Sequence, residues 1–292
     1  MYDQAQHLRR VMEHKNEGTA RNTKVISVIS GKGGVGKSNI SLSFSLSLAE
    51  LEKKVLLFDL DIGMANIDIL MGMSPSSHIV DVIEQDRTIW DIMEEGPGGI
   101  QLVAGGSGLT NIFEMTAAKQ ERFSQQMSLL DGYFDYIIFD MGAGASDDSL
   151  NFILSSNETI IITTPEPTSI TDAYAMVKYI YSKEPSLPGS ILVNRTESKK
   201  EGQQTAENLK RAAMRFLGKE LAVLGSVPYD KQVLKAVKKQ TPFSLKYPAS
   251  PASQAIKTCA KAYLGKNNVD EKPAYRHFLN QIKGFLKKGA GK

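Results

Sequence analysis

The run of residues 30–38, SGKGGVGKS, constrains the fold of this chain more than any other feature. An apolar strand is predicted directly before it, at 25–29, and a helix rich in Leu, Ser and Ala directly after it, at 39–51. Strand, glycine-rich loop and helix in this order aim the free N–H groups of a helix amino end at an anion. The sequence therefore predicts a phosphate-binding loop, with a chance glycine-rich turn as the alternative.

The side chains of this loop suit a nucleoside triphosphate. Lys37 is placed to reach the β and γ phosphate oxygens, and Ser38 to coordinate Mg²⁺ directly. Lys32 stands at the start of the loop and is expected to point away from the phosphates that its own loop binds. A second copy of the site facing it would give that charge a partner, which hints at a dimer with nucleotide at the interface. The residues expected to surround the nucleotide phosphates are Gly33, Gly34, Val35, Gly36, Lys37, Ser38 and Asn39.

Three aspartates follow two further predicted strands. Asp59 comes at the end of strand 55–58, Asp140 at the end of strand 136–139, and Asp61 just beyond the first of them. In an open parallel sheet the carboxyl ends of the strands form the edge where ligands bind. Asp59 and Asp140 can therefore hold Mg²⁺ through water, and Asp61 can orient an attacking water or accept its proton. For any single aspartate, the alternative is a turn or a helix cap.

These motifs resemble the deviant-Walker-A ATPases, the MinD/ParA class, whose signature is this lysine-glycine-glycine loop. Residues 58–68 resemble its switch I segment, 138–144 its switch II, and 164–174 the MinD-like branch, so that the resemblance covers roughly residues 23–264. The resemblance implies an ATPase with ATP and Mg²⁺ as cofactors, a homodimer with ATP and a monomer with ADP or without nucleotide.

The resemblance also assigns roles to single residues. It implies that Asp61 is the catalytic aspartate, that Lys37 acts in its own site, and that Lys32 acts across the dimer interface. Glu166 and Asp172 match positions at which MinD proteins contact the other subunit or its regulators, and Glu166 is expected beside the nucleotide.

The base is predicted to be adenine. Guanine-specific P-loop proteins usually carry an Asn-Lys-x-Asp element, whereas this chain has Asn194, Arg195 and Thr196 after strand 191–193, with no aspartate at the required spacing. An Asn amide can bond the adenine edge and an Arg guanidinium can stack on its face, and the family uses Asn194 and Arg195 in this way. A turn role is the alternative for Asn194. The segment that resembles the loop closing over the other side of the base contains Pro228, Tyr229 and Asp230.

Composition favours one large α/β domain. The chain has 292 residues, 41% of them hydrophobic, and seven apolar strand candidates alternate with helices. We therefore expect a doubly wound, mainly parallel sheet of seven to eight strands flanked by helices, as in the P-loop NTPases. The single cysteine, Cys259, excludes a disulfide framework and argues against the iron-sulfur carrier ATPases, which need paired cysteines. No apolar run reaches about 18 residues and no signal peptide is recognised, so we expect a cytoplasmic protein.

The two ends of the chain lie outside this ATPase domain, which we place at residues 23–264. A polar linker is expected at 265–273 and a basic amphipathic helix at 274–292. Such a helix can lie in an anionic membrane surface, and two of them on one dimer gain avidity of about 10² to 10⁴. ATP would then recruit the protein to the inner face of the cell membrane; a helix docked on the core is the alternative. The residues expected to meet the membrane are Phe278, Leu279, Ile282, Lys283, Phe285, Leu286 and Lys287.

The first 22 residues form a separate segment in which a short helix is expected. The pattern of Asp3, Gln4, Leu8 and Arg9 resembles the N-terminal activator element of the FlhG family, also called YlxH or FleN, which regulates flagellar number and position. The resemblance implies that the segment stimulates the signal-recognition-type GTPase FlhF, with Gln4 assisting GTP hydrolysis, and that flagellar C-ring proteins are further partners. A frayed leader without a partner is the alternative.

Three other functions fit parts of the sequence. A MinD-type division-site regulator is one, although the extension before the first strand speaks against it. A ParA-type DNA segregation ATPase is another, but 35 Lys and Arg against 32 Asp and Glu give a weak average charge, so no specific nucleic acid is expected. Lys199 with Lys200 and Lys238 with Lys239 could still form a basic patch. The third is a nucleotide-dependent scaffold with negligible turnover.

Overall fold

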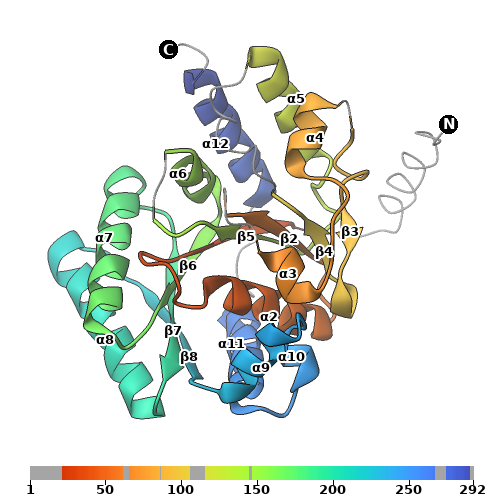
Figure 1. Ribbon diagram of the computed structural model, residues 1–292. Coiled ribbons are helices and arrows are strands. Elements are labelled where there is room, and N and C mark those ends of the chain that lie inside the picture. Colours follow the sequence, from red (N-terminus) through yellow and green to blue (C-terminus); the bar gives the residue numbers. More distant parts are fainter. Residues whose placement is uncertain are drawn as a thin grey trace.

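A single twisted sheet of eight strands forms the centre of the protein (Figure 1). The computed structural model describes residues 22–61, 66–85, 87–105, 116–144, 147–266 and 274–289. The strand order is β3-β4-β2-β5-β1-β6-β7-β8, and every neighbouring pair is parallel except β3 with β4. The strands are β1 (Lys24–Ile29), β2 (Val55–Leu60), β3 (Glu94–Glu95), β4 (Gln101–Val103), β5 (Tyr136–Met141), β6 (Glu158–Thr163), β7 (Gly189–Thr196) and β8 (Ala222–Pro228).

Helices cover both faces of the sheet, and each face has its own apolar core. One face carries α2 (Lys37–Glu50), α3 (Ile67–Met71), η1 (Pro97–Gly99), α9 (Lys231–Lys238), α10 (Phe243–Lys246) and α11 (Pro251–Lys266). The other carries α4 (Ile79–Glu84), α5 (Ala117–Ser128), α6 (Asp147–Ser155), α7 (Pro167–Lys183), α8 (Lys199–Leu217) and α12 (Ala274–Gly289). The predicted doubly wound α/β fold is confirmed.

The helix after the glycine-rich loop, α2, is buried on nearly all sides. Its sequence alternates Ser with Leu, Ile and Phe, and ten of its residues from Lys37 to Leu48 are buried between the sheet and neighbouring helices. Serine is tolerated there because the hydroxyls of Ser45 and Ser47 donate to backbone carbonyls one turn earlier. The helix begins two residues before the predicted start, so Lys37 and Ser38 lie in its first turn.

The aspartates predicted at strand ends lie at one edge of the sheet. Strands β2 and β5 each run two residues further than predicted, so that Asp59 and Asp140 are their penultimate residues. The two strands are hydrogen-bonded neighbours, and these two residues are directly opposite in register. Because the strands are parallel, both residues lie at the carboxyl edge, as the predicted topology requires.

Helix α12 is docked on the core. Tyr275, Phe278, Ile282 and Leu286 are buried in the same apolar core as α5 and α6, and Leu279 and Phe285 pack against its edge. The Tyr275 hydroxyl donates to the Met127 carbonyl at 2.7 Å. The docked alternative therefore describes this structure, because burial of four large apolar side chains outweighs the solvation of a free helix. Membrane binding by a released helix stays a prediction.

The other predictions for the two ends concern the bounds of the linker, two lysines of α12 and the N-terminal segment. Helix α11 continues to Lys266, two residues into the predicted linker, whereas α12 begins at Ala274 as expected. Lys283 is half-buried, and the side chain of Lys287 lies outside the described atoms. Asp3, Gln4, Leu8 and Arg9 lie outside the described residues. None of the described helices is long and apolar enough to cross a membrane.

Candidate nucleotide-binding site

The glycine-rich loop joins β1 to α2 and needs its glycines for backbone conformation and for space. Gly34 and Gly36 have φ angles of 77° and 89°, in the left-handed region that side chains disfavour. Gly31 has no room for a side chain, because a Cβ atom there would lie 2.1 Å from the backbone oxygen of Asp172 in α7. The loop is therefore packed directly against the first half of α7.

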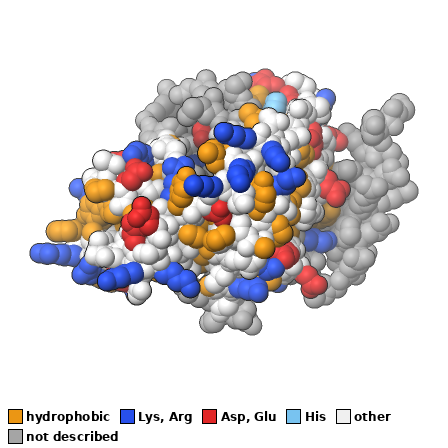
Figure 2. Space-filling model, turned by 60° about the horizontal axis from the view of Figure 1, so that its bottom comes forward, with side chains coloured by type: hydrophobic (Ala, Val, Ile, Leu, Met, Phe, Trp, Pro, Cys, Tyr) orange, Lys and Arg blue, Asp and Glu red, His pale blue; other side chains and the backbone are white. Residues whose placement is uncertain are grey.

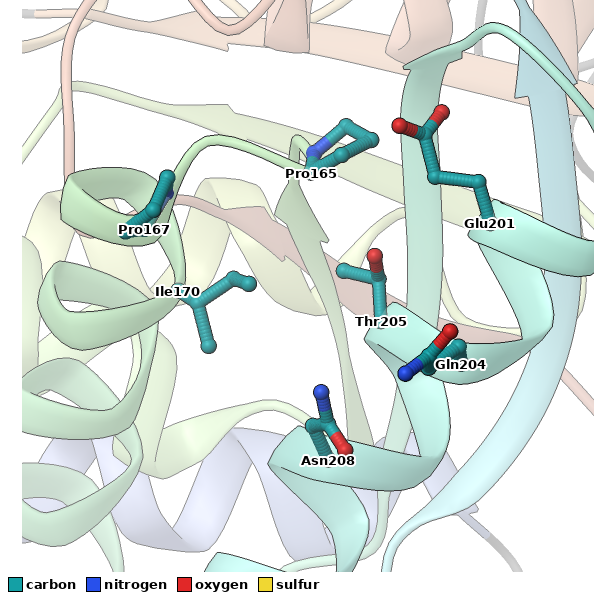
Figure 3. A pocket seen from close by; sticks show the side chains of 7 residues that line it. All are labelled: Pro165, Pro167, Ile170, Glu201, Gln204, Thr205 and Asn208. Atoms are coloured by element: carbon teal, nitrogen blue, oxygen red, sulfur yellow. The ribbon is translucent and has the colours of Figure 1, made fainter.

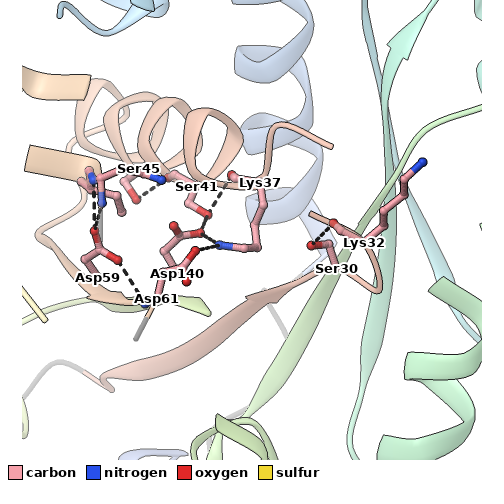
Figure 4. Close-up of polar contacts among 10 residues, drawn as sticks. Ser30, Lys32, Lys37, Ser41, Ser45, Asp59, Asp61 and Asp140 are labelled. Atoms are coloured by element: carbon pink, nitrogen blue, oxygen red, sulfur yellow. Dashed lines mark hydrogen bonds and ion pairs between the residues drawn. The ribbon is translucent and has the colours of Figure 1, made fainter. Parts of the chain in front are cut away.

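Lys37 is buried and forms the centre of a charged cluster (Figure 4). Its Nζ donates to Oδ1 of Asp140 at 2.9 Å and lies 4.0 Å from Oδ2 of Asp61. The Ser41 hydroxyl, one helical turn after Lys37, donates to the same Asp140 oxygen at 2.7 Å. The sequence analysis did not identify Ser41, although its position four residues after Lys37 on one helix could have done so. Lys37, Asp61 and Asp140, which the sequence analysis expects to act on the nucleotide, thus meet at one point.

Asp140 retains one oxygen for a further ligand. Its Oδ2 is buried and has no hydrogen-bond partner among the described residues, which is costly for a carboxylate. Ser38, in the first turn of α2, is half-buried at the same edge of the sheet. A hydroxyl oxygen and a carboxylate that acts through water are ligands that Mg²⁺ accepts, so these two residues fit the expected metal.

Both carboxylate oxygens of Asp59 accept hydrogen bonds from the backbone, a role that the sequence analysis gave only as the alternative for an aspartate. Its Oδ1 accepts from the backbone amide of Asp61 at 3.1 Å, and its Oδ2 accepts from those of Asn66 and Ile67 at 2.9 and 3.0 Å. Burial, together with the nearby negative charge of Asp140, raises its pKa to about 6, whereas the three backbone amides act in the opposite direction. Asp59 therefore closes the loop between β2 and α3, and a contact with Mg²⁺ through water stays a prediction.

Asp61 lies between the P-loop lysine and the segment after β5. Burial raises the pKa of its carboxyl, and the positive charge of Lys37 opposes that shift. A Cβ atom on Gly142 would lie 3.1 Å from Oδ1 of Asp61, so the backbone after β5 approaches this carboxylate closely. The carboxylate is thus half-buried beside a cation and available to a small molecule such as water.

Lys32 points away from this cluster, on the opposite side of the loop (Figure 4). Its Nζ lies 3.1 Å from Oε2 of Glu166 and 3.2 Å from the Thr168 hydroxyl, both at the start of α7. The side chains of Lys32 and Glu166 are 40% and 58% exposed, so this contact is at the surface. The sequence analysis placed Glu166 beside the nucleotide and did not identify Thr168; here both hold Lys32.

The predicted adenine segment begins next to the P-loop. The Asn194 side-chain amide donates to the Val35 carbonyl at 2.8 Å, and a Cβ atom on Gly36 would lie 2.5 Å from that same nitrogen. Arg195 follows with a φ angle of 59°, a strained conformation for a residue other than glycine, and its side chain is exposed. The asparagine therefore fixes the distance between β7 and the phosphate loop, a contact that sequence spacing did not indicate.

The segment expected on the other side of the base follows β8. Tyr229 is 60% exposed, and its backbone amide donates to the Thr196 carbonyl at 2.9 Å, which joins this segment to the end of β7. Asp230 caps α9 by accepting from the Gln232 amide at 2.8 Å, and its other oxygen accepts from the Ala252 amide. Pro228 is the last residue of β8. The two predicted adenine segments are therefore neighbours, with Tyr229 available for contact and Asp230 engaged as a cap.

A cavity of about 420 Å³ lies beside α7, between this helix and α8 (Figure 3). It contains none of the phosphate-loop or adenine-segment residues. Its wall is formed by Pro165, Pro167, Ile170, Glu201, Gln204, Thr205 and Asn208.

Cys259 is 3% exposed within α11, and burial raises the pKa of its thiol to about 12. A thiol in this state is neither a nucleophile nor a metal ligand at neutral pH. Because the chain has no other cysteine, it does not supply the pair that an iron-sulfur cluster at a dimer interface requires.

Comparisons with known proteins identify the family of this chain. The ParA family model, described as NUBPL iron-transfer P-loop NTPase, matches residues 21–264. The antiactivator FleN of Pseudomonas aeruginosa is 36% identical over 85% of this chain and 88% of its own length. The flagellum site-determining protein YlxH of Helicobacter pylori is 32% identical over 91% and 92%.

Solved structures show the same fold at lower identity. MinD of Pyrococcus horikoshii, solved as a complex with Mg-ADP, has a TM-score of 0.68 at 22% identity and covers 85% of this chain and 98% of its own. A chain of the MinC:MinD cell division protein complex of Aquifex aeolicus has a TM-score of 0.67 at 24% identity, again over 85% of this chain and 98% of its own. The chain belongs to the ParA family of P-loop NTPases, in the MinD-like group that contains FleN and YlxH.

Proposed function

We propose that this protein is an ATPase that uses ATP-dependent dimerisation to regulate flagellar number or placement. The observation that carries the enzymatic part is the buried cluster at the phosphate loop, in which Lys37, Asp61 and Asp140 meet. The flagellar part is supported by the relatives, which are a FleN antiactivator and a flagellum site-determining YlxH.

Different residues of one subunit bind the phosphates, the adenine and the metal ion. Backbone amides of the loop and the Lys37 ammonium bind the phosphates, and the loop glycines allow close approach. Asn194 and Arg195 bind the adenine, with Tyr229 on the other side of the base. Ser38 and Asp140 hold Mg²⁺, with Asp59 behind them; the ion supplies positive charge to the phosphate oxygens. Asp61 orients the attacking water and accepts its proton.

Lys32 is assigned to the phosphates of the other subunit, where it stabilises negative charge as an arginine finger does. In the monomer it contacts Glu166 and Thr168 of its own chain. An exposed ion pair of this kind contributes about 0 to 1 kcal/mol, because solvent screens it. Breaking the contact between Lys32 and Glu166 therefore costs little free energy, so Lys32 is available to bind the phosphates in the other subunit.

Membrane attachment is assigned to α12 after its release from the core. In the docked state its large apolar side chains face α5 and α6 instead of solvent. Release exposes Phe278, Ile282 and Leu286 beside Lys283 and Lys287, and two such helices on a dimer bind together. The protein is therefore expected at the inner face of the cell membrane as an ATP-bound dimer, and in the cytoplasm as an ADP-bound or nucleotide-free monomer.

The N-terminal segment is assigned to a partner GTPase. Gln4, with Asp3, Leu8 and Arg9, is expected to dock on FlhF and to assist GTP hydrolysis there, as the resemblance to the FlhG element implies. Flagellar C-ring proteins are the further expected partners. The segment precedes Asn22, which leads directly into β1, so it is tethered to the ATPase domain.

One set of measurements on the full-length chain tests these roles separately. ATP hydrolysis should be lost in Asp61→Ala, and ATP-dependent dimerisation in Lys32→Ala, which should still bind nucleotide. FlhF GTP turnover should rise on addition of the protein and should not rise with Gln4→Ala. Hydrolysis without any effect on FlhF would refute the proposed partner, whereas an Asp61→Ala variant as active as wild type would refute the proposed catalytic role.

A further inference from the structure

The chain concentrates positive charge in one region after the adenine segment. Residues 231–269 contain eight lysines and no aspartate or glutamate. The formal net charge of the whole chain is only +3, so the remaining residues together are net negative. This asymmetry is hidden in the average composition, and it falls on α9, α10 and α11, which lie on the same face of the sheet.

Helix α9 arranges part of this charge as a stripe. Leu234, Lys235 and Lys238 come three, four and seven residues after Lys231, which places all four on one side of the helix. All four are exposed. The opposite side packs on the core through Ala236, so the stripe cannot rotate inward.

The next helix extends the stripe into a surface. Lys239 follows α9 directly, and α10 adds Leu245 and Lys246, which are also exposed. Leu234 and Leu245 have exposed fractions of 55% and 43%. We call these seven residues the α9–α10 surface: Lys231, Leu234, Lys235, Lys238, Lys239, Leu245 and Lys246. Figure 2 looks onto this side of the molecule and shows basic side chains interspersed with hydrophobic ones.

Two acidic groups on this face of the sheet are already engaged. The Asp230 carboxylate accepts from two backbone amides, those of Gln232 and Ala252. Glu50 of α2 forms an ion pair with Lys257 of α11. Within the described parts of the chain, the five lysines of the α9–α10 surface have no carboxylate within ion-pair distance. An anionic partner would therefore meet uncompensated charge.

We propose that the α9–α10 surface binds an anionic lipid bilayer directly. Lysines attract acidic headgroups from a distance, and leucines placed among them gain free energy only where an apolar layer lies beneath the charge. Duplex nucleic acid offers phosphates to the lysines but no apolar phase to the leucines. The α9–α10 surface lies on the face of the sheet opposite the docked α12, so this contact does not require the release of α12 (Figure 1). Alone it is weak and reversible, so the nucleotide-free monomer stays mainly in the cytoplasm, and the contact adds to that of α12 in the ATP-bound dimer.

The first test compares two lysine pairs in the full-length, nucleotide-free protein. Co-sedimentation is measured with vesicles of phosphatidylglycerol and phosphatidylcholine, and with phosphatidylcholine alone. Lys235→Glu with Lys238→Glu should weaken binding to the anionic vesicles by more than about tenfold, since each lysine near such a surface contributes about fivefold. The control is Lys199→Glu with Lys200→Glu at the exposed start of α8, which should bind as wild type does. Equal binding by both double variants would overturn the proposal.

The second test separates a bilayer from a nucleic acid. Leu234→Gln with Leu245→Gln keeps every lysine and should weaken vesicle binding. An environment-sensitive dye on Leu234→Cys should brighten on anionic vesicles, and the buried Cys259 leaves the label specific. A leucine variant that binds vesicles as wild type does, or a dye that responds to random duplex DNA and not to vesicles, would overturn the lipid assignment. The change in vesicle binding caused by ATP reports α12 separately.

Discussion

Replacing Gly31 with alanine should disconnect the phosphate loop from α7. The added Cβ atom would lie 2.1 Å from the Asp172 carbonyl oxygen, 2.2 Å from its carbon and 2.7 Å from the Ala173 nitrogen. All three atoms belong to the backbone of a helix and cannot rotate away as a side chain would. The loop itself must therefore move.

The size of that movement follows from the contact distance. A carbon normally approaches a carbonyl oxygen to about 3.3 Å, so loop and helix must separate by about 1.2 Å. Inserting a methyl group into a site without room costs about 1 to 3 kcal/mol. Displacements of about 1 Å in a catalytic arrangement can lower the rate by about 10²-fold. Gly31→Ala should thus affect stability moderately and ATP turnover strongly.

Gly33→Ala is the matched control, because it places the same methyl group in the same loop. Its Cβ atom would have only Ala143 near it, at an ordinary 3.8 Å. Urea unfolding of the nucleotide-free proteins, followed by the fluorescence of the single tryptophan and by circular dichroism, compares the two free energies of unfolding. Gly31→Ala should lose about 1 to 3 kcal/mol and Gly33→Ala less than about 0.5 kcal/mol.

A Gly31→Ala protein as stable as Gly33→Ala would refute the reasoning, since it would mean that the loop and α7 are not in contact in solution. Dimerisation gives a second readout. Because α7 also holds Lys32 through Glu166 and Thr168, a displaced loop should change the ATP concentration that dimerisation requires.

Four further predictions follow from single contacts. Lys37→Met should lower the free energy of unfolding by about 3 kcal/mol, because it leaves the Asp140 carboxylate buried without a cation, and adding Asp140→Asn should restore part of the loss in urea unfolding. Glu166→Gln should change stability by less than about 0.5 kcal/mol, because the ion pair with Lys32 is exposed. It should also lower the ATP concentration that dimerisation requires, measured by sedimentation velocity. A higher required concentration would contradict the idea that Glu166 holds Lys32 within its own subunit. Tyr275→Phe should cost about 1 kcal/mol in the same unfolding assay, because the buried Met127 carbonyl loses its donor. Burial raises the pKa of Asp59 from 3.8 to about 6, so the folded protein binds this proton more tightly than the unfolded chain. The contribution of Asp59 to stability without nucleotide should therefore fall by up to about 3 kcal/mol as the pH rises from about 4 to about 6, and Asp59→Asn should remove that contribution in urea unfolding at the two pH values.

The phosphate loop was predictable because it is a local structure. Strand, glycines, lysine and helix are consecutive in the chain, and their conformations follow from near neighbours, so residues 30–38 indicated the loop and the class of fold without any long-range information. The carboxyl-edge position of Asp59 and Asp140 followed from the same logic, because parallel strands end at one edge.

The partners of these residues were not predictable in the same way. The amide of Asn194 meets the carbonyl of Val35 across 159 positions of sequence, and Lys32 meets Glu166 across 134. Such contacts depend on the order of strands in the sheet. The strands that carry the loop and the adenine segment are separated only by β6, an adjacency that periodicity does not encode.

For helix α12, the sequence determined the helix itself and the tertiary structure determined what covers its apolar face. Its amphipathic pattern determined that the segment from Ala274 onward would be a helix with one apolar face. A lipid surface and a protein core satisfy that face by the same removal of apolar area from water, so the pattern cannot distinguish them. Phe278 and Ile282 are covered by protein in this structure because α5 and α6 present an apolar surface to them. That surface exists only in the tertiary structure.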